Sequence, residues 1–199
     1  ALGTCVSSFK YFKSGNVHLK TALYSAVGAL IGAWMGSQLA MVLEDRVLRM
    51  CLMVILPVAG VFILINRKFG ENEDEHDQVK LLYPKAFVIG LFLGAYDGFF
   101  GPGTGTFLII LFCMVLRLPI VTASGNAKLT NLASNIASAV AYLLGGKVLF
   151  WLAVPAACCT IAGNYLGAHL AIKNGTKFIR PIIALVIVLL MIKVVSELF

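Results

Sequence analysis

The stretch GAYDGFFGPGTGTFL, residues 94–108, lies inside an apolar run from Ala86 to Leu116 whose only charged residue is Asp97. The run is long enough to enter a bilayer. Its centre does not suit a regular helix, because glycine is a poor helix former and Pro102 lacks a backbone N–H. We therefore expect two shorter helices that meet at a glycine-rich tip. Irregular backbone at membrane depth is tolerated only where it lines a cavity or is buried in protein, which predicts a functional site near the tip.

The chain on either side of this stretch is also apolar. Hydrophobic residues make up 60% of the 199 residues and charged residues only 13%, which is too apolar for a soluble domain of this size. A helix needs about 20 apolar residues to cross a bilayer. Uncharged runs of about that length occupy residues 21–43, 50–66, 129–146 and 148–168. These runs predict an all-α polytopic membrane protein.

The net charge of +7 would suggest nucleic-acid binding in a soluble protein. In a membrane protein it reflects Lys and Arg in loops that face the cytoplasm and anionic lipid. No basic patch alternates with exposed aromatic residues, so we expect the lipid bilayer and no nucleic acid as a partner.

Turn residues and charges divide the chain into predicted helices. Residues 1–12 look like the end of a helix, and further helices are expected at 20–43, 46–66, 86–116 in two halves, 122–144, 148–172 and 177–198. An acidic loop, residues 69–84, surrounds His76 with Glu and Asp. Its spacing lacks the EF-hand pattern, so we expect a solvated loop rather than a metal site.

An internal repeat appears when the chain is shifted so that residues 1–68 lie on residues 132–199. Gly32 and Gly36 then meet Gly163 and Gly167. Small residues four apart let helices approach closely, either within the chain or in a homodimer, and duplicated halves are typical of secondary transporters. Two similar membrane segments matched by chance remain the alternative.

The repeat defines the predicted organisation of the chain. Residues 1–68 are expected to be the C-terminal part of a first repeat, and residues 85–199 a second repeat with a broken hairpin at 86–117. Residues 85–131 have no counterpart before Ala1, so we expect a second glycine-rich hairpin upstream. The more basic end differs between the halves, as inverted repeats require, which places loop 67–85 in the cytoplasm and the C-terminus outside.

The tip has the features of an anion site. The second half-helix begins near Gly103, and its first backbone N–H groups have no partner within the helix. Such groups, with the positive end of the helix dipole, bind anions. Thr104 and Thr106 add hydroxyl donors, although Thr104 would equally suit a helix cap. The tip residues assigned to substrate binding are Gly101, Gly103, Thr104, Gly105 and Thr106.

The helix after residue 122 is unusually polar for a membrane span. Asn126, Lys128, Asn131 and Asn135 follow one another at about three- and four-residue spacing, so several share a face. Polar side chains in a membrane helix face protein or water, and we assign these four to substrate binding. Lys128 would supply positive charge, although its place near the helix start also suits snorkelling to the cytoplasmic surface.

Asp97 is a lone carboxylate at membrane depth, which is costly and by default functional. It has three candidate roles: it caps the tip, pairs with Lys128, or titrates as a coupling group. No nucleotide-binding motif is present, so transport energy would come from a gradient of protons or Na⁺.

The five cysteines show no metal-ligand spacing, so no metal and no cofactor is expected. Adjacent Cys158 and Cys159 leave a membrane redox or sulfur-relay protein as an alternative, although neighbours on one helix point to different faces. A passive anion channel is the other alternative.

Four motifs closely resemble those of the TauE/SafE sulfite exporter family: residues 94–107, AKLxNxxSN at 127–135, GGKV at 145–148 and GxxxGA at 163–168. The resemblance implies a multi-pass inner-membrane transporter of two related halves, not an enzyme. It implies transport, commonly export, of sulfite, thiosulfate or organosulfonates, and supports the site roles assigned above. The family's first glycine-rich motif would precede Ala1.

Overall fold

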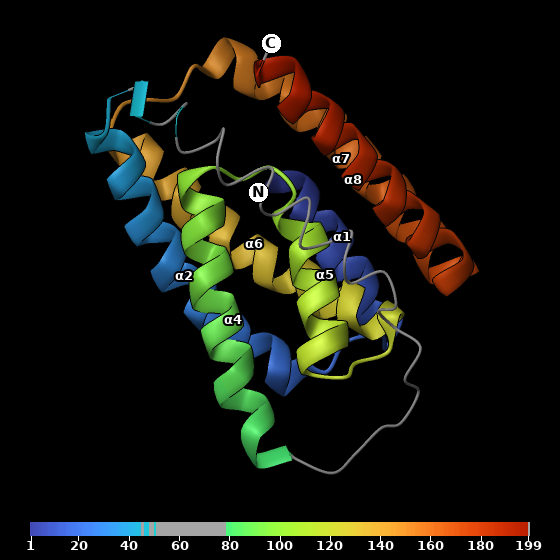
Figure 1. Ribbon diagram of the computed structural model, residues 1–199. Helices are drawn as coiled ribbons and strands as arrows, with labels where there is room; N and C mark the ends of the chain where they lie inside the picture. Colours follow the sequence, from blue (N-terminus) through green and yellow to red (C-terminus); the bar gives the residue numbers. More distant parts are fainter. Residues whose placement is uncertain (45, 48–49, 51–78, 199) are drawn as a thin grey trace.

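The computed structural model describes residues 1–44, 46–47, 50 and 79–198, and every regular element within them is an α-helix (Figure 1). Most of the predicted helix 46–66 and of the acidic loop lies outside these residues. The described helices are α1 (Leu2–Lys13), α2 (Leu19–Val42), α4 (Val79–Phe99), α5 (Thr104–Val115), α6 (Ile120–Leu144), α7 (Phe150–Asn174) and α8 (Thr176–Leu198). The all-helical class predicted from the sequence is confirmed.

The helix that leads to the tip begins earlier than expected. The predicted loop extended to residue 84, whereas α4 begins at Val79 and continues through Pro84. Residues 79–83 are mostly ordinary helix formers, and a proline near the start of a helix removes few hydrogen bonds. The chain is interrupted after Phe99, and α5 begins at Thr104. In Figure 1 the chain turns back after α4, so that α4 and α5 lie side by side and are joined at one end.

A seam of small residues joins α2 to α4, the most extensively packed pair of described helices (Figure 1). Gly32 of α2 lies against the backbone of Leu91, and Gly94 of α4 lies against the backbone of Ala29. An added Cβ at either glycine would come closer than 3.0 Å to that backbone. The glycines that share this property along the seam are Gly28, Gly32, Gly36, Gly90, Gly94 and Gly98. Their spacing lets the two backbones touch.

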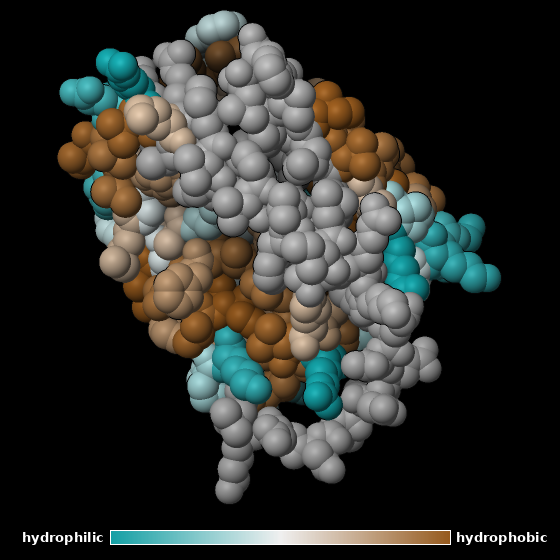
Figure 2. Space-filling model, in the orientation of Figure 1, coloured by the Kyte–Doolittle hydropathy of each residue, from teal (hydrophilic) through white to brown (hydrophobic). Residues whose placement is uncertain are grey.

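The polarity of the molecule is that of a membrane protein. Among the described residues ten polar residues are buried, including Ser25, Thr130 and Ser134, whereas large apolar residues such as Trp34, Trp151 and Leu189 are exposed. In Figure 2 the coloured part of this face is largely hydrophobic, and its hydrophilic residues gather towards the edges. Two described helices, Leu19–Val42 and Phe150–Asn174, are long and apolar enough to cross a membrane by length and composition.

Two turns in different parts of the chain have the same backbone hydrogen bonds. After α1, Gly15 (φ 73°) donates to Phe12 O and Asn16 donates to Tyr11 O. After α6, Gly146 (φ 65°) donates to Leu143 O and Lys147 donates to Tyr142 O. Both are Schellman turns, in which glycine adopts the left-handed conformation that ends the helix. Each residue of the second turn lies 131 positions after its counterpart (146 − 15 = 131).

The central helix is α6, which packs against α1, α2, α4 and α5. α7 packs chiefly on α1, and α8 runs along the outer edge of the molecule in Figure 1. On α7, Gly163 and Gly167 are exposed, and a Cβ at either would meet no described atom within 4 Å. α6 therefore holds the interior polar residues, while Gly163 and Gly167 of α7 border an open space, the first cavity described below.

Candidate functional site

The tip between α4 and α5 is built on two glycines with positive φ, Gly101 (84°) and Gly103 (82°). Residues other than glycine rarely adopt this backbone conformation, which explains why both positions are glycine. Thr106 donates its backbone N–H to Gly103 O at 2.9 Å, so part of the first turn of α5 is satisfied locally. The N–H groups of Gly103 and Gly105 form no backbone hydrogen bond among the described residues. These two amides are therefore available to a ligand.

Hydroxyl groups hold the tip in place. Tyr96 donates from its OH to Pro102 O at 2.7 Å, and Thr104 donates from Oγ1 to Gly101 O at 2.9 Å. At the end of α4, Gly98 O accepts from Ser37 Oγ and from Tyr142 OH. The last carbonyls of a helix lack partners within it, and these donors satisfy one of them. The tip is thus a fixed structure supported from α2 and α6.

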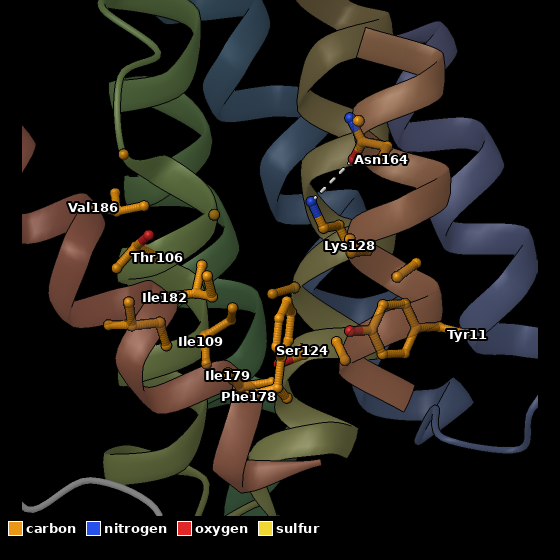
Figure 3. Close-up of a pocket in the computed structure, with 18 residues that line it drawn as sticks. Tyr11, Thr106, Ile109, Ser124, Lys128, Asn164, Phe178, Ile179, Ile182 and Val186 are labelled. Atoms are coloured by element: carbon orange, nitrogen blue, oxygen red, sulfur yellow. Dashed lines mark hydrogen bonds between the residues drawn. The ribbon is translucent and has the colours of Figure 1, made fainter. Parts of the chain in front are cut away.

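Two cavities meet at the tip, with volumes of about 370 Å³ and about 520 Å³. Gly103, Gly105, Lys128 and Asn164 line both. The first cavity also includes Thr106 and the apolar side chains of Ile109 and Ile182 (Figure 3). The second is more polar and adds Asp97, Gly101, Thr104, Asn131, Asn135, Ser138, Tyr142 and Thr160, among others.

Lys128 projects from α6 into both cavities. Its Nζ donates to Asn164 Oδ1 at 3.1 Å, the bond drawn in Figure 3, and Ser7 Oγ donates to the same oxygen at 3.2 Å. An ammonium group has three donors, so two remain for water or a ligand. The Lys128 side chain is partly buried and reaches from α6 to Asn164 on α7.

Asp97 occupies the last turn of α4, beside the tip. Ser134 Oγ of α6 lies 2.5 Å from its Oδ2. One turn away, Asn135 Nδ2 donates to Asn131 O at 2.6 Å and contacts Asn131 Oδ1. Lys128 bonds Asn164 rather than Asp97, so the predicted pairing of the two charged groups is not among the hydrogen bonds found. The carboxyl of Asp97 instead contacts the hydroxyl of Ser134.

The structure brings together most of the residues that the sequence assigned to substrate binding. Gly101, Gly103, Thr104, Gly105, Thr106, Lys128, Asn131 and Asn135 each line at least one cavity. Asn126 lines neither. It is completely buried, and its Oδ1 accepts a hydrogen bond from the backbone N–H of His18 at 2.9 Å. Asn126 therefore fixes the start of α2 in this structure.

Several cavity residues were not assigned from the sequence, notably Asn164, Tyr11, Ser138 and Tyr142. The internal repeat contained a signal for some of them, because Ser7 and Tyr11 align with Ser138 and Tyr142. Asn164 aligns with Ala33, so the repeat gives no signal for it, but an amide side chain on the following membrane helix could be expected from the sequence to reach the cavity.

The alternative sites do not coincide with the cavities. Cys158 and Cys159 are exposed on α7, and neither lines either cavity. In the part of the chain that the structure describes, no three His, Cys, Asp or Glu side chains gather in a metal-binding arrangement. The candidate site therefore consists of one lysine, one carboxyl, amide side chains, hydroxyl groups and helix-terminal N–H groups.

An all-helical, apolar molecule with a polar cavity at a broken helix defines the class of membrane transporters. The model of the family "Sulfite exporter TauE/SafE" matches residues 1–194, so the chain belongs to this family and is a transmembrane transporter.

Curated relatives agree with this assignment. A probable membrane transporter protein of Haemophilus influenzae is 28% identical over 198 residues, which cover 99% of this chain and 77% of the relative. The probable membrane transporter protein YfcA of Escherichia coli K12 is 30% identical over 187 residues, 94% of this chain and 69% of the relative. The probable membrane transporter protein YdhB of Bacillus subtilis is 24% identical over 184 residues, 89% and 75% of the two chains. No solved structure matches the chain.

Proposed function

We propose that this protein is a secondary transporter that moves small sulfur-containing anions, such as sulfite, thiosulfate or an organosulfonate, out of the cell across the inner membrane. One observation carries the proposal: Lys128 lines the same cavities as Gly103 and Gly105 at the start of α5. A cation and unpaired helix-terminal N–H groups thus face one space, and together they favour a negatively charged ligand.

The chemistry of the two cavities suits an oxyanion with several acceptor oxygens. The ammonium group of Lys128 on α6 and the hydroxyl of Thr106 on α5 would both donate hydrogen bonds to the bound anion. Asn164 orients the lysine. Ile109 and Ile182 would accommodate the carbon part of an organosulfonate in the first cavity. The family description supports a sulfur oxyanion over other small anions.

We also propose that the two halves are inverted repeats. The identical hydrogen bonds of the turns at Gly15 and Gly146 support this organisation. So do the bounds of two helices, because α2 (Leu19–Val42) moved by 131 positions covers residues 150–173 and α7 is Phe150–Asn174. The proposed orientation has loop 67–85 in the cytoplasm and the C-terminus outside.

The first prediction tests the anion site. In proteoliposomes that contain the purified protein, uptake of labelled thiosulfate and sulfite should saturate with concentration, as a carrier requires and a passive channel does not. Lys128→Ala should weaken the apparent anion affinity about tenfold to a hundredfold, because a charge-assisted hydrogen bond contributes about 1.5–3 kcal/mol. Lys147→Ala removes an exposed lysine and serves as the matched control.

Two results would contradict the proposal. One is absence of sulfur-anion flux from the folded wild-type protein, and the other is equal affinity in Lys128→Ala and the wild type. Flux that is lost in Cys158→Ser or Cys159→Ser would favour the sulfur-relay alternative.

A further inference from the structure

Asp97 shares its surroundings with two buried hydroxyl groups that already have other acceptors. Ser134 Oγ, 2.5 Å from Asp97 Oδ2, is also 3.1 Å from Asn131 O. Thr104 lines the same cavity as Asp97, and its Oγ1 donates to Gly101 O at 2.9 Å. Ser134 and Thr104 are each 1% exposed. Water therefore has little access to either hydroxyl.

The protonation state of Asp97 decides in which direction the neighbouring hydroxyls donate their hydrogen bonds. A hydroxyl has one proton to donate, and the two carbonyl oxygens accept only. If Ser134 and Thr104 donate to their carbonyls, the short contact between Asp97 and Ser134 needs a proton from Asp97. If Asp97 is a carboxylate, Ser134 donates to it and turns away from Asn131 O. Asn131 O still accepts from Asn135 Nδ2, and Gly101 O accepts from the backbone N–H of Thr104, so neither carbonyl depends on the protonation state of Asp97. Asp97 can therefore bind and release a proton without leaving a buried carbonyl unpaired.

Few other charged or titratable groups face Asp97. From α6 these are Lys128 and Tyr142, and from α4 the neighbouring Tyr96. The described parts of α2, α5 and α7 contribute no charged side chain to this cavity. Lys128 donates a hydrogen bond to Asn164 and lines both cavities of the anion site. The charge of the cavity therefore changes chiefly with the proton on Asp97.

We propose that Asp97 is a proton-binding site coupled to the anion site, so that one proton and one anion bind together and cross the membrane together. An ionised Asp97 would offset the positive charge of Lys128 in the same cavity and repel an entering anion. When Asp97 is neutral, the positive charge of Lys128 is not offset and can attract the anion. By linkage, the bound anion must strengthen proton binding by the same factor.

Thr104 connects the two sites structurally. It is the first residue of α5, and its hydroxyl supports Gly101 O at the tip. An ionised Asp97, in the same cavity, would compete with Gly101 O for this hydroxyl and weaken that support. The helix terminus whose N–H groups face the anion is then altered along with the charge.

Joint movement of one proton and one monovalent anion transfers no net charge. For a monovalent anion such as hydrogen sulfite or an organosulfonate, the membrane potential then has no influence, and the direction depends on the concentrations of anion and proton on the two sides. Divalent thiosulfate with one proton carries one net negative charge, which a potential that is negative inside drives outward. Export proceeds when the anion accumulates inside beyond the opposing proton gradient. This inference rests on the proposed anion transport, and it names the proton rather than Na⁺ as the coupled ion because the carboxyl contacts the hydroxyl of Ser134 at hydrogen-bond distance.

The second prediction tests the coupling in proteoliposomes loaded with a pH-sensitive dye. Thiosulfate entering with the wild-type protein should acidify the lumen, and external acid should raise the apparent affinity for thiosulfate roughly 5- to 150-fold, the usual range of coupling. Asp97→Asn, which resembles the protonated state, should still exchange thiosulfate across the membrane. It should lose both the acidification and the pH dependence of affinity. Glu44→Gln removes an exposed acid outside the cavities and is the matched control.

The dye measurement on the wild-type protein needs no variant, so the inference remains testable if Asp97→Asn does not fold. Thiosulfate flux without proton movement, proton movement opposite to the anion, or a strict need for Na⁺ would each overturn it and leave anion transport standing. An unchanged pH dependence in folded Asp97→Asn would also overturn it. Absence of any sulfur-anion flux would instead reject the proposed function itself.

Discussion

Asn126 is completely buried between α6 and the start of α2, where it accepts a hydrogen bond from the backbone N–H of His18. The third prediction follows from this contact. Asn126→Ala would leave that N–H without its acceptor inside the protein, which costs about 1–3 kcal/mol. We expect a lower melting temperature in detergent, with nearly unchanged thiosulfate affinity in the folded protein.

Asn131→Ala provides the comparison at the same scale. Asn131 is only partly buried and lines the second cavity, so its loss should change affinity more than stability. A large fall in affinity with unchanged stability in Asn126→Ala would restore the substrate-binding role that the sequence suggested.

The sequence placed Asn126 and Asn131 in one group because both are polar residues on one membrane helix. Spacing along a helix identifies residues that share a face, but it does not identify what the face contacts. The bond between Asn126 and His18 joins positions 108 residues apart, which no local pattern encodes. The contact between Asp97 and Ser134 spans 37 residues and was equally hidden.

At the scale of elements, α2 and α4 depend on glycines that leave no space for a side chain. The fourth prediction is that Gly32→Leu forces the two helices apart, because even a Cβ there would meet the backbone of Leu91. Overpacking of a close contact costs about 1–3 kcal/mol. The melting temperature in detergent should fall, and thiosulfate flux per folded protein should fall with it, since α4 positions the tip. An unchanged melting temperature would show that the seam is more compliant than these contacts indicate.

Helix positions were largely predictable because apolar runs, glycines and prolines mark them directly. The break after Phe99 was expected from Pro102 and the glycines around it, and the helix ends at Ser14 and Gly145 were expected from turn residues. The start of α4 was not, because a proline in the first turns of a helix looks like a boundary and is tolerated there.

At the scale of the whole molecule, α2 and α7 are equivalent in the proposed repeat but differ in their surroundings. α2 packs on α4, whereas Gly163 and Gly167 of α7 are exposed among the described residues and line the first cavity. The sequence alone showed two similar seams and did not show that the described residues cover one of them and not the other, because identical motifs contain no information about what lies against them.

The fifth prediction tests the repeat through this difference. Gly163 stands at the position of Gly32, yet a Cβ on it meets no described atom within 4 Å. If the repeat is correct, a glycine-containing helix of the first repeat covers α7 in the native membrane protein as α4 covers α2. Gly163→Leu should then lower the melting temperature about as much as Gly32→Leu. On a face open to lipid the same change should instead stabilise α7 by up to about 1 kcal/mol, since leucine is the better helix former. A destabilisation that varies with protein concentration would assign the face to a homodimer, so the sign and the concentration dependence together decide what covers α7.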